Sequence, residues 1–285
     1  MTGIIDTHAH LQLSQFDSDR EAVLRRAWEA GLEAVMVPGV DLASSERAVV
    51  MAEADPRLYA AVGCHPHDAR RANDRVLADL ADLARHPRVV AVGEIGLDFY
   101  RNLSPREAQL RVLRYQLATA SEAGLPVVIH CREAQREMLP IIEEWSRSLG
   151  ATLPGGRPLG VMHYFSGDLA LALRYAELGF LVSVHDSVTY PESERVRKVA
   201  AKLPLEHLVV ETDSPYGAPR SRRGQRNEPA YLAEAVAVIA ELRGTRYEDV
   251  ALHTRENAVR LFGLARPERA AAPPASRVGA RRGAP

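Results

Sequence analysis

Five short segments of this chain run through aliphatic residues and reach a side chain that can bind a divalent metal. They span residues 4–10, 90–94, 126–130, 161–163 and 208–213. Runs of β-branched and aliphatic residues are typical of strands that are buried on both faces in a parallel sheet. Each run therefore predicts a strand whose C-terminal end opens into a polar site.

The spacing of these segments matches the repeat of a barrel built from eight β/α units. One unit takes roughly 30 residues, so the intervals place the segments on the first, fourth, fifth, sixth and eighth strands. The sequence therefore predicts an α/β fold, a single (β/α)8 TIM-type barrel over residues 1–264. From residue 265 the composition shifts to Ala, Pro, Gly and Arg, which predicts a disordered tail over residues 265–285.

Helix-like runs alternate with the strands, as the barrel requires. Ser104, followed by proline and then glutamate at the third helical position, is expected to be an N-cap. Further strands are expected at residues 34–38, 58–63 and 180–184. Helices are expected at residues 18–30, 42–54, 73–85, 104–123, 133–149, 169–178, 192–201, 229–242 and 247–262.

The composition excludes several classes of protein. The formal net charge is −1, so any binding of nucleic acid must come from a local patch or from metal ions, because no overall basic field exists. The two cysteines are expected to be reduced core thiols. The N-terminus resembles no secretion signal and no long apolar run is present. We therefore expect a cytoplasmic protein with no membrane attachment and no obligate protein partner.

His8 and His10 form a His-x-His pair at the end of the first predicted strand. Residues two apart on a strand point to the same face, so both imidazoles are expected to enter the barrel mouth and chelate one ion. Asp6 has the same parity. It is expected either to contact the site or to orient one of the ligands.

Glu94, His130 and His163 come from three consecutive predicted strands and supply a second ligand set. Glu94 has two oxygens and is expected to bridge two cations, the arrangement that stabilises the attacking and leaving oxygens of an in-line displacement. Asp213 is expected to ligate the first ion and to accept a proton from metal-activated water; alternatively it caps the turn at Ser214. Two divalent ions are predicted, with Mg, Mn and Zn all open.

The strand ends carry the motifs DTHAHL (6–11), GEIGLD (93–98), HCR (130–132), HYFSG (163–167) and ETDSPY (211–216), with GCHPH (63–67) and RNEP (226–229) between or after them. Together they resemble the TatD family of metal-dependent deoxyribonucleases, within the amidohydrolase superfamily. The resemblance covers residues 3–264. It implies a TIM-type barrel and divalent-metal-dependent cleavage of phosphodiester bonds. The metal ligands it implies are His8, His10, Glu94, His130, His163 and Asp213.

Residues around the predicted metals are candidates for substrate contacts. Arg132 is expected to clamp a phosphate bidentately, or else to pair with acidic neighbours at the surface. Tyr164 and Tyr216 are expected to stack on an unpaired base, or else to pack loops. Tyr164 stands where the family commonly has cysteine, a departure that affects substrate preference rather than the predicted ligands.

Three further positions complete the predicted substrate site. His65 and His67 are expected to donate to phosphate oxygens or to position a leaving group, with loop packing as the alternative. Arg226 belongs to the basic loop over residues 220–226, which either contacts backbone phosphates or is a solvated turn.

The leading functional hypothesis is a 3′ to 5′ exonuclease that acts on single-stranded DNA or DNA 3′ ends, because a barrel mouth accepts a strand end more readily than the interior of a duplex. The alternative is a metallohydrolase of another ester or amide, such as a D-aminoacyl-tRNA deacylase or a small-molecule amidohydrolase. Fold and metal centre do not choose between these activities. A non-catalytic binding protein is disfavoured by the intact ligand set.

Overall fold

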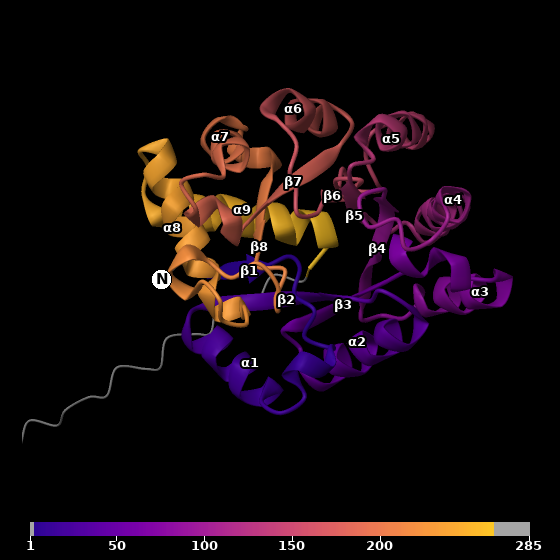
Figure 1. The fold of residues 1–285 in the computed structure, drawn as a ribbon, viewed down its shortest axis with the longest axis horizontal. Coiled ribbons are helices and arrows are strands. Elements are labelled where there is room, and N and C mark those ends of the chain that lie inside the picture. The colour runs from indigo at the N-terminus through magenta and orange to yellow at the C-terminus, as the bar shows by residue number, and fades with distance from the viewer. Residues whose placement is uncertain (1–2, 265–285) are drawn as a thin grey trace, which may run out of the picture.

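The computed structural model describes residues 3–264, in which eight strands form one parallel sheet in their order along the chain. Figure 1 shows helices lying outside this ring of strands. The predicted tail at residues 265–285 lies outside the described residues. The strands are β1 (Ile4–Asp6), β2 (Leu32–Pro38), β3 (Leu58–Val62), β4 (Val89–Asp98), β5 (Val127–Arg132), β6 (Gly160–Met162), β7 (Phe180–His185) and β8 (Leu208–Glu211).

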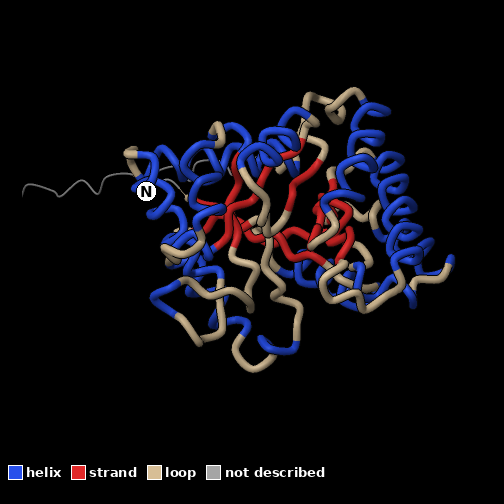
Figure 2. The backbone as a smooth tube through the Cα atoms, turned by 45° about the horizontal axis from the view of Figure 1, so that its top comes forward, coloured by secondary structure: helices blue, strands red, loops and turns tan. Residues whose placement is uncertain are grey.

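Backbone hydrogen bonds between the two ends of the sheet bring the ring near closure. The Thr7 amide donates to the Val210 carbonyl at 3.1 Å, and the Asp213 amide donates to the His8 carbonyl at 2.9 Å. Figure 2 shows the strands at the centre of the molecule, enclosed by helices. The predicted TIM-type barrel is confirmed, and each of the five predicted metal-binding segments lies on the strand expected for it.

The predicted helices are present, with small shifts at their ends. They are α1 (Arg20–Glu29), α2 (Leu42–Ala54), α3 (Asp74–Leu83), α4 (Arg106–Ala123), α5 (Gln135–Leu149), α6 (Leu169–Glu177), α7 (Glu194–Lys202), α8 (Leu232–Arg243) and α9 (Tyr247–Phe262). Short 3-10 helices cover Ser14–Phe16, Pro66–Arg71, Asp186–Thr189, Leu205–His207, Arg220–Arg222 and Pro229–Tyr231. Among residues 3–264, no helix combines the length and apolar character needed to cross a membrane.

Local side-chain bonds explain where α2 begins, but none caps the start of α4. At the start of α2, Asp41 accepts a hydrogen bond from the Ser44 amide, and the Ser44 hydroxyl accepts one from the Asp41 amide. The expected N-cap of α4 is wrong. The Ser104 hydroxyl donates instead to the His67 carbonyl at 2.7 Å, so it joins two loops, and Pro105 occupies the cap position.

The interior of the barrel is a small apolar cluster, separate from the larger one that fills the space between strands and helices. Helix α9 contributes Leu261 and Phe262 to it and crosses the ring of strands in Figure 1. The Asn257 amide donates to the carbonyls of Leu205 and Leu208 where β8 begins, so α9 lies at the N-terminal ends of the strands. The strands contribute Ile5, Ala34, Met36, Ala61, Ala91, Val128, Val161, Leu181 and Val209.

Strand β4 differs from its prediction in one respect. It was expected to end at Glu94, but it continues to Asp98, and its pairing with β5 shifts register between Val92 and Ile95. Such an irregularity re-aims a side chain, and here Glu94 lies within it. Gly96, with φ of +149°, lies so close to β5 that a Cβ would meet the His130 carbonyl oxygen. Only glycine allows this approach.

Candidate metal centre

Four side chains converge at the C-terminal end of the barrel. Nε2 of His8 and Nε2 of His10 lie 3.2 Å apart. Glu94 Oε2 lies 3.3 Å from the first nitrogen and 3.5 Å from the second. Asp213 Oδ1 lies 3.8 Å and 3.5 Å from the same two atoms. The expectation that both imidazoles of the His-x-His pair enter the mouth is therefore met.

The geometry and chemistry of these atoms fit a divalent ion. Ligand atoms about 2.1 Å from a tetrahedral ion are about 3.4 Å from one another. The observed separations of 3.2 to 3.8 Å lie around this value. All four side chains are largely buried, so these nitrogen and oxygen atoms face one another in a site shielded from bulk solvent. A cation at this point would satisfy all of them at once.

The second oxygen of Glu94 faces a second group of nitrogens. Glu94 Oε1 lies 2.9 Å from His130 Nδ1 and 3.4 Å from His65 Nε2. His163 Nε2 lies 3.6 Å from the same oxygen and 3.8 Å from Asp213 Oδ1, so His163 stands between the two groups. Glu94 thus directs one oxygen to each group, as a bridging carboxylate would.

His65 has a different position from the one expected for it. It was predicted to contact substrate phosphate, yet its buried imidazole belongs to a potential ligand cluster with Glu94 and His130. The 3-10 helix that begins at Pro66 explains this, because the His65 ring accepts a hydrogen bond from the His67 amide and is held inward. We therefore count His65 among the candidate ligands.

The surroundings of these groups set their protonation. Burial raises the pKa of Glu94, but His65 and His163 outweigh it and hold that pKa well below the usual range. Burial lowers the pKa of His65 to about 4, which leaves the imidazole neutral and able to ligate. Burial also lowers the pKa of His163, but Glu211 and Glu94 outweigh this and raise it to about 10. In the absence of metal, His163 therefore carries a proton.

Two carboxylates that orient ligand histidines were not assigned a role from the sequence. Asp98 Oδ2 lies 3.1 Å from His130 Nε2, so His130 keeps Nδ1 facing Glu94. Glu211 Oε1 lies 3.0 Å from His163 Nδ1. A carboxylate behind a histidine ligand fixes the orientation of its ring and raises its basicity. The sequence did contain a signal for both residues, because Asp98 ends the motif GEIGLD and Glu211 begins ETDSPY. The spacing of the motifs could not show which histidine each carboxylate contacts.

Asp6 and Asn227 fix the backbone that carries the ligands. The Asp6 carboxylate accepts from the amides of His8 and Thr212, both at 3.1 Å, and so joins the ends of β1 and β8. Of its two expected roles, Asp6 thus takes the orienting one. The Asn227 amide donates to Asp186 at 2.8 Å and to the Thr212 carbonyl at 3.0 Å. These bonds hold the β8 loop, and Asp213 with it, against β7.

The two predicted stacking tyrosines differ in exposure. Tyr216 is 49% exposed, and its ring centroid lies 6.1 Å from that of His10, so it stands at the edge of the ligand cluster. Tyr164 stacks on His185 at a centroid distance of 3.6 Å. Because Tyr164 is only partly exposed and His185 covers one of its faces, that ring packs a loop, and the alternative role given for it is the better fit.

The structure gives the three remaining predicted substrate contacts different surroundings. Arg132 is exposed and lies over the Tyr100 ring at 4.0 Å. The Nε2 atom of His67 lies 2.9 Å from Asp98, and its ring centroid lies 4.2 Å from that of His65, so this histidine borders the centre through these two residues. Arg226 pairs bidentately with Asp19, at 2.9 and 2.7 Å. Its expected contact with substrate is therefore disfavoured, because the guanidinium is engaged by a residue too distant in sequence to be foreseen.

Comparisons with known proteins agree with this geometry. The family model described as TatD related DNase matches residues 5–263. The metal-dependent hydrolase YabD of Bacillus subtilis is 38% identical over 92% of this chain and 99% of its own length. A protein of Pectobacterium carotovorum named 3′-5′ ssDNA/RNA exonuclease TatD is 36% identical over 92% of this chain and 100% of its own.

Solved structures give the same result. The crystal structure of the TatD homologue YjjV of Escherichia coli superposes with a TM-score of 0.84 at 35% identity and covers 92% of this chain and 98% of the other. These relatives, together with the converging histidines and carboxylates, support binding of divalent metal by this chain. Fold, site and sequence agree along the described length, and the chain belongs to the TatD related DNase family of metal-dependent hydrolases.

Proposed function

We propose that this protein is a 3′ to 5′ exonuclease that cleaves phosphodiester bonds of single-stranded DNA at a two-metal site. The observation that carries the proposal is the division of the Glu94 carboxylate, which directs one oxygen to the His8 and His10 nitrogens and the other to His130. Two relatives, each 36% identical to this chain, are named 3′-5′ ssDNA/RNA exonucleases. Their name supports a nucleic-acid substrate.

The ligands divide between two ions. His8, His10 and Asp213 would hold the first, His130 and His65 the second, and Glu94 would belong to both. His163 adjoins both groups. Bound divalent ions would lower the pKa of a coordinated water and stabilise the charge that develops on the attacking and leaving oxygens.

The protein's own groups supply positioning and proton transfer. Asp213 Oδ1 points into the cluster, and its side chain keeps 13% exposure, so this carboxylate can accept the proton of an attacking water. Asp98 and Glu211 keep the rings of His130 and His163 in place. Because these contacts exist in the free protein, the ligands need little rearrangement before reaction.

The rim residues favour the end of a single strand. Tyr216 presents an exposed ring beside His10, on which an unpaired base can stack. Arg132 presents a guanidinium that can bind a phosphate through two parallel hydrogen bonds. A base can stack on Tyr216 only when it is unpaired. Unpairing a base in the interior of a duplex costs free energy, whereas the end of a single strand is already unpaired.

A substrate panel tests the proposal. The protein, loaded with Mg²⁺, Mn²⁺ or Zn²⁺, is given single-stranded DNA labelled at either its 5′ or its 3′ end, with duplex DNA, RNA, D-aminoacyl-tRNA and a chromogenic carboxylic ester as alternatives. We expect stepwise shortening of the 5′-labelled strand and immediate release of a mononucleotide from the 3′-labelled one. Hydrolysis of the ester or the aminoacyl-tRNA, with single strands left intact, would overturn the proposal.

A further inference from the structure

The loop between β4 and α4 presents a second aromatic ring at the same end of the barrel. Tyr100 is 57% exposed and Leu103 is 50% exposed, whereas most large apolar side chains of the described residues are buried. Tyr100 stands two residues after Asp98, the carboxylate that holds His130. The ring is therefore tied by a short, fixed length of chain to the candidate metal centre.

Arg132 lies against this ring. Its guanidinium carbon is 4.0 Å from the centroid of the Tyr100 ring. Among residues 3–264 the Arg132 side chain has no hydrogen-bond or ion-pair partner, so its N–H groups are free to bind an anion. A guanidinium stacked on an aromatic ring keeps its donors in its own plane. Since Arg132 covers only one face of a ring that remains more than half exposed, a planar group can stack on the other face.

The loop that carries Tyr100 is fastened at both ends. Gln109 accepts from the Asp98 amide at 2.8 Å and donates to the Ser104 carbonyl at 2.9 Å. The Phe99 amide donates to the Arg132 carbonyl at 2.9 Å, so the loop and the end of β5 are held together. The Tyr100 and Arg132 pair is thus formed before any ligand binds, which reduces the entropy lost on binding.

Tyr100 and Tyr216 belong to opposite sides of the mouth. In a ring of eight strands, β4 and β8 are diametrically opposed, and each tyrosine follows one of them. The two rings therefore flank the candidate metal centre.

We propose that Tyr100 and Arg132 form a nucleotide subsite, in which Tyr100 stacks on the base and Arg132 binds its phosphate. Tyr216 then stacks on the base across the scissile bond. The enzyme would hold the two nucleosides that flank this bond, one on each side of the metals. This inference rests on the proposed nuclease function, because it assigns the position of a strand that the nuclease must bind.

The first test compares variants on single-stranded DNA. Stacking contributes roughly 1 to 3 kcal/mol per base, so Tyr100→Ala should raise KM roughly 5- to 150-fold, with a smaller change in kcat. Tyr100→Trp should restore KM, because it restores the ring without the hydroxyl. The matched control is Tyr115→Ala, since Tyr115 is 40% exposed but lies on α4 away from the loop.

The second test locates the base. Two oligonucleotides carry an abasic residue, one at the 3′ terminal nucleotide and the other at the penultimate one. If Tyr100 stacks on one of these bases, Tyr100→Ala should add almost nothing to the loss caused by the matching abasic residue and should add its full loss at the other. Tyr216→Ala should show the opposite pattern.

The outcomes separate the two proposals. An inactive wild-type enzyme on every single strand would overturn the nuclease function and this subsite with it. An active wild type in which Tyr100→Ala behaves like Tyr115→Ala, or in which its loss adds fully at both abasic positions, would overturn the subsite alone.

Discussion

The two ends of the barrel interior differ in the side chains that fill them, which are charged and polar at one end and apolar at the other. At the C-terminal ends of the strands, carboxylates and imidazoles from distant segments converge on common points around Glu94. At the N-terminal ends, α9 seals the interior with apolar side chains such as Leu261 and Phe262. The same set of strands thus carries a polar site at one end and a dry plug at the other.

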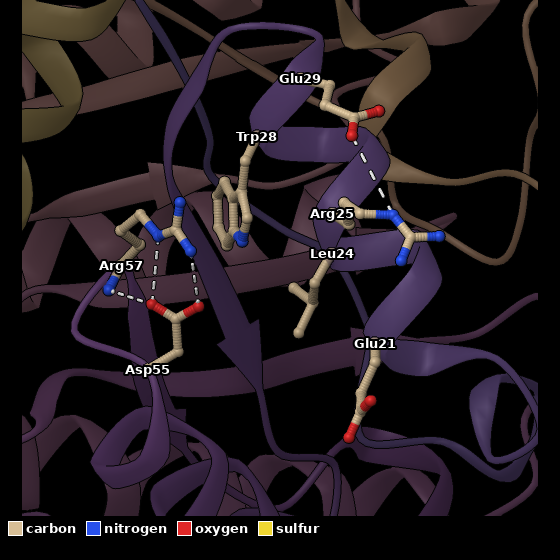
Figure 3. A pocket seen from close by; sticks show the side chains of 7 residues that line it. All are labelled: Glu21, Leu24, Arg25, Trp28, Glu29, Asp55 and Arg57. Carbon is tan, nitrogen blue, oxygen red and sulfur yellow. Dashed lines mark hydrogen bonds and ion pairs between the residues drawn. The ribbon is translucent and has the colours of Figure 1, made fainter.

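The surface at the N-terminal end also carries charges, but they are paired locally. Figure 3 shows a hollow between α1 and the residues that precede β3. There, Arg57 pairs with Asp55 at 3.2 and 3.1 Å and lies 4.0 Å from the Trp28 ring. Arg25 and Glu29 form a second local pair at 4.0 Å, and among residues 3–264 no cluster of three potential metal ligands lies in this hollow.

The two ends also differ in how many of their buried polar atoms lack a hydrogen-bond partner. Within residues 3–264, those without a hydrogen-bond partner include Nδ1 of both His8 and His10, Oε2 of Glu211 and Oδ1 of Asp186, all near the mouth. Leaving a buried polar group unpaired costs about 1 to 3 kcal/mol. One such atom, Arg243 Nε, lies beside Leu203 on the side where β8 begins, so the opposite end is not free of this cost. The comparison teaches that this protein concentrates such costs where metal and substrate would bind.

The largest expected effect comes from removing the Glu94 carboxylate at the C-terminal end of the barrel. Removing a carboxylate at the opposite end is the control. Glu94→Ala should abolish hydrolysis, because both groups of nitrogens lose their shared oxygen ligand, while Asp55→Ala should leave turnover near wild type. Turnover is measured in metal-replete buffer, and circular dichroism checks the fold. More than a tenth of wild-type activity in Glu94→Ala would contradict the two-metal assignment.

A smaller effect is expected at Asp213. Asp213→Asn keeps an oxygen that can ligate but loses the proton acceptor, so kcat should fall by roughly 10² to 10⁴, while metal content measured by atomic absorption should fall much less. A near-normal turnover with an unchanged pH–rate profile would show that Asp213 only caps its turn.

Proton release should accompany metal binding at the mouth. The pKa of His163 is raised from 6.5 to about 10, so His163 is protonated near neutral pH, and an ion that takes it as a ligand must displace that proton. Apparent Zn²⁺ affinity should therefore rise about tenfold per pH unit from about pH 6 to 8. Calorimetry in two buffers of different ionisation enthalpy measures the released proton, and an affinity independent of pH would refute this.

The same raised pKa has a consequence for the metal-free fold. The ion pair between His163 and Glu211 should stabilise the metal-free fold fully between about pH 4.5 and 6.5. Its contribution is lost as pH rises through about 10, where His163 loses its proton, and as pH falls toward about 2, where Glu211 gains one.

The smallest effect is expected at the N-terminal end. Trp28→Ala removes a partly exposed ring and its contact with Arg57, which should lower the free energy of unfolding by about 1 kcal/mol and leave kcat/KM within about twofold of wild type. Urea denaturation and a kinetic assay check both values. A large loss of activity would mean that the two ends are coupled.

The sequence predicts the barrel and the candidate ligand histidines because both depend on local patterns. An aliphatic run ending in histidine indicates a strand end wherever it occurs, and the spacing between runs orders the strands. The extension of β4 beyond Glu94 was missed, because a register shift depends on how β5 lies beside it.

Residues whose structural partners are distant in the sequence were the ones given a different role or no role. Arg226 was expected at the substrate, but its partner Asp19 comes from the β1 loop. Asp98 belongs to the motif GEIGLD but was given no role, because the spacing along the sequence does not reveal its contact with His130. His65 was named for substrate, because only the approach of Glu94 reveals it as a candidate ligand.

The position of α9 has a consequence for how the protein is made. The ring between β1 and β8 cannot close until Asp213 has left the ribosome, because the Asp213 amide bonds to the His8 carbonyl. Its interior cannot be sealed until Phe262 has followed. For most of its synthesis, the nascent chain therefore exposes an unfinished apolar interior to water, and the helix that excludes it is the last of those in residues 3–264 to emerge.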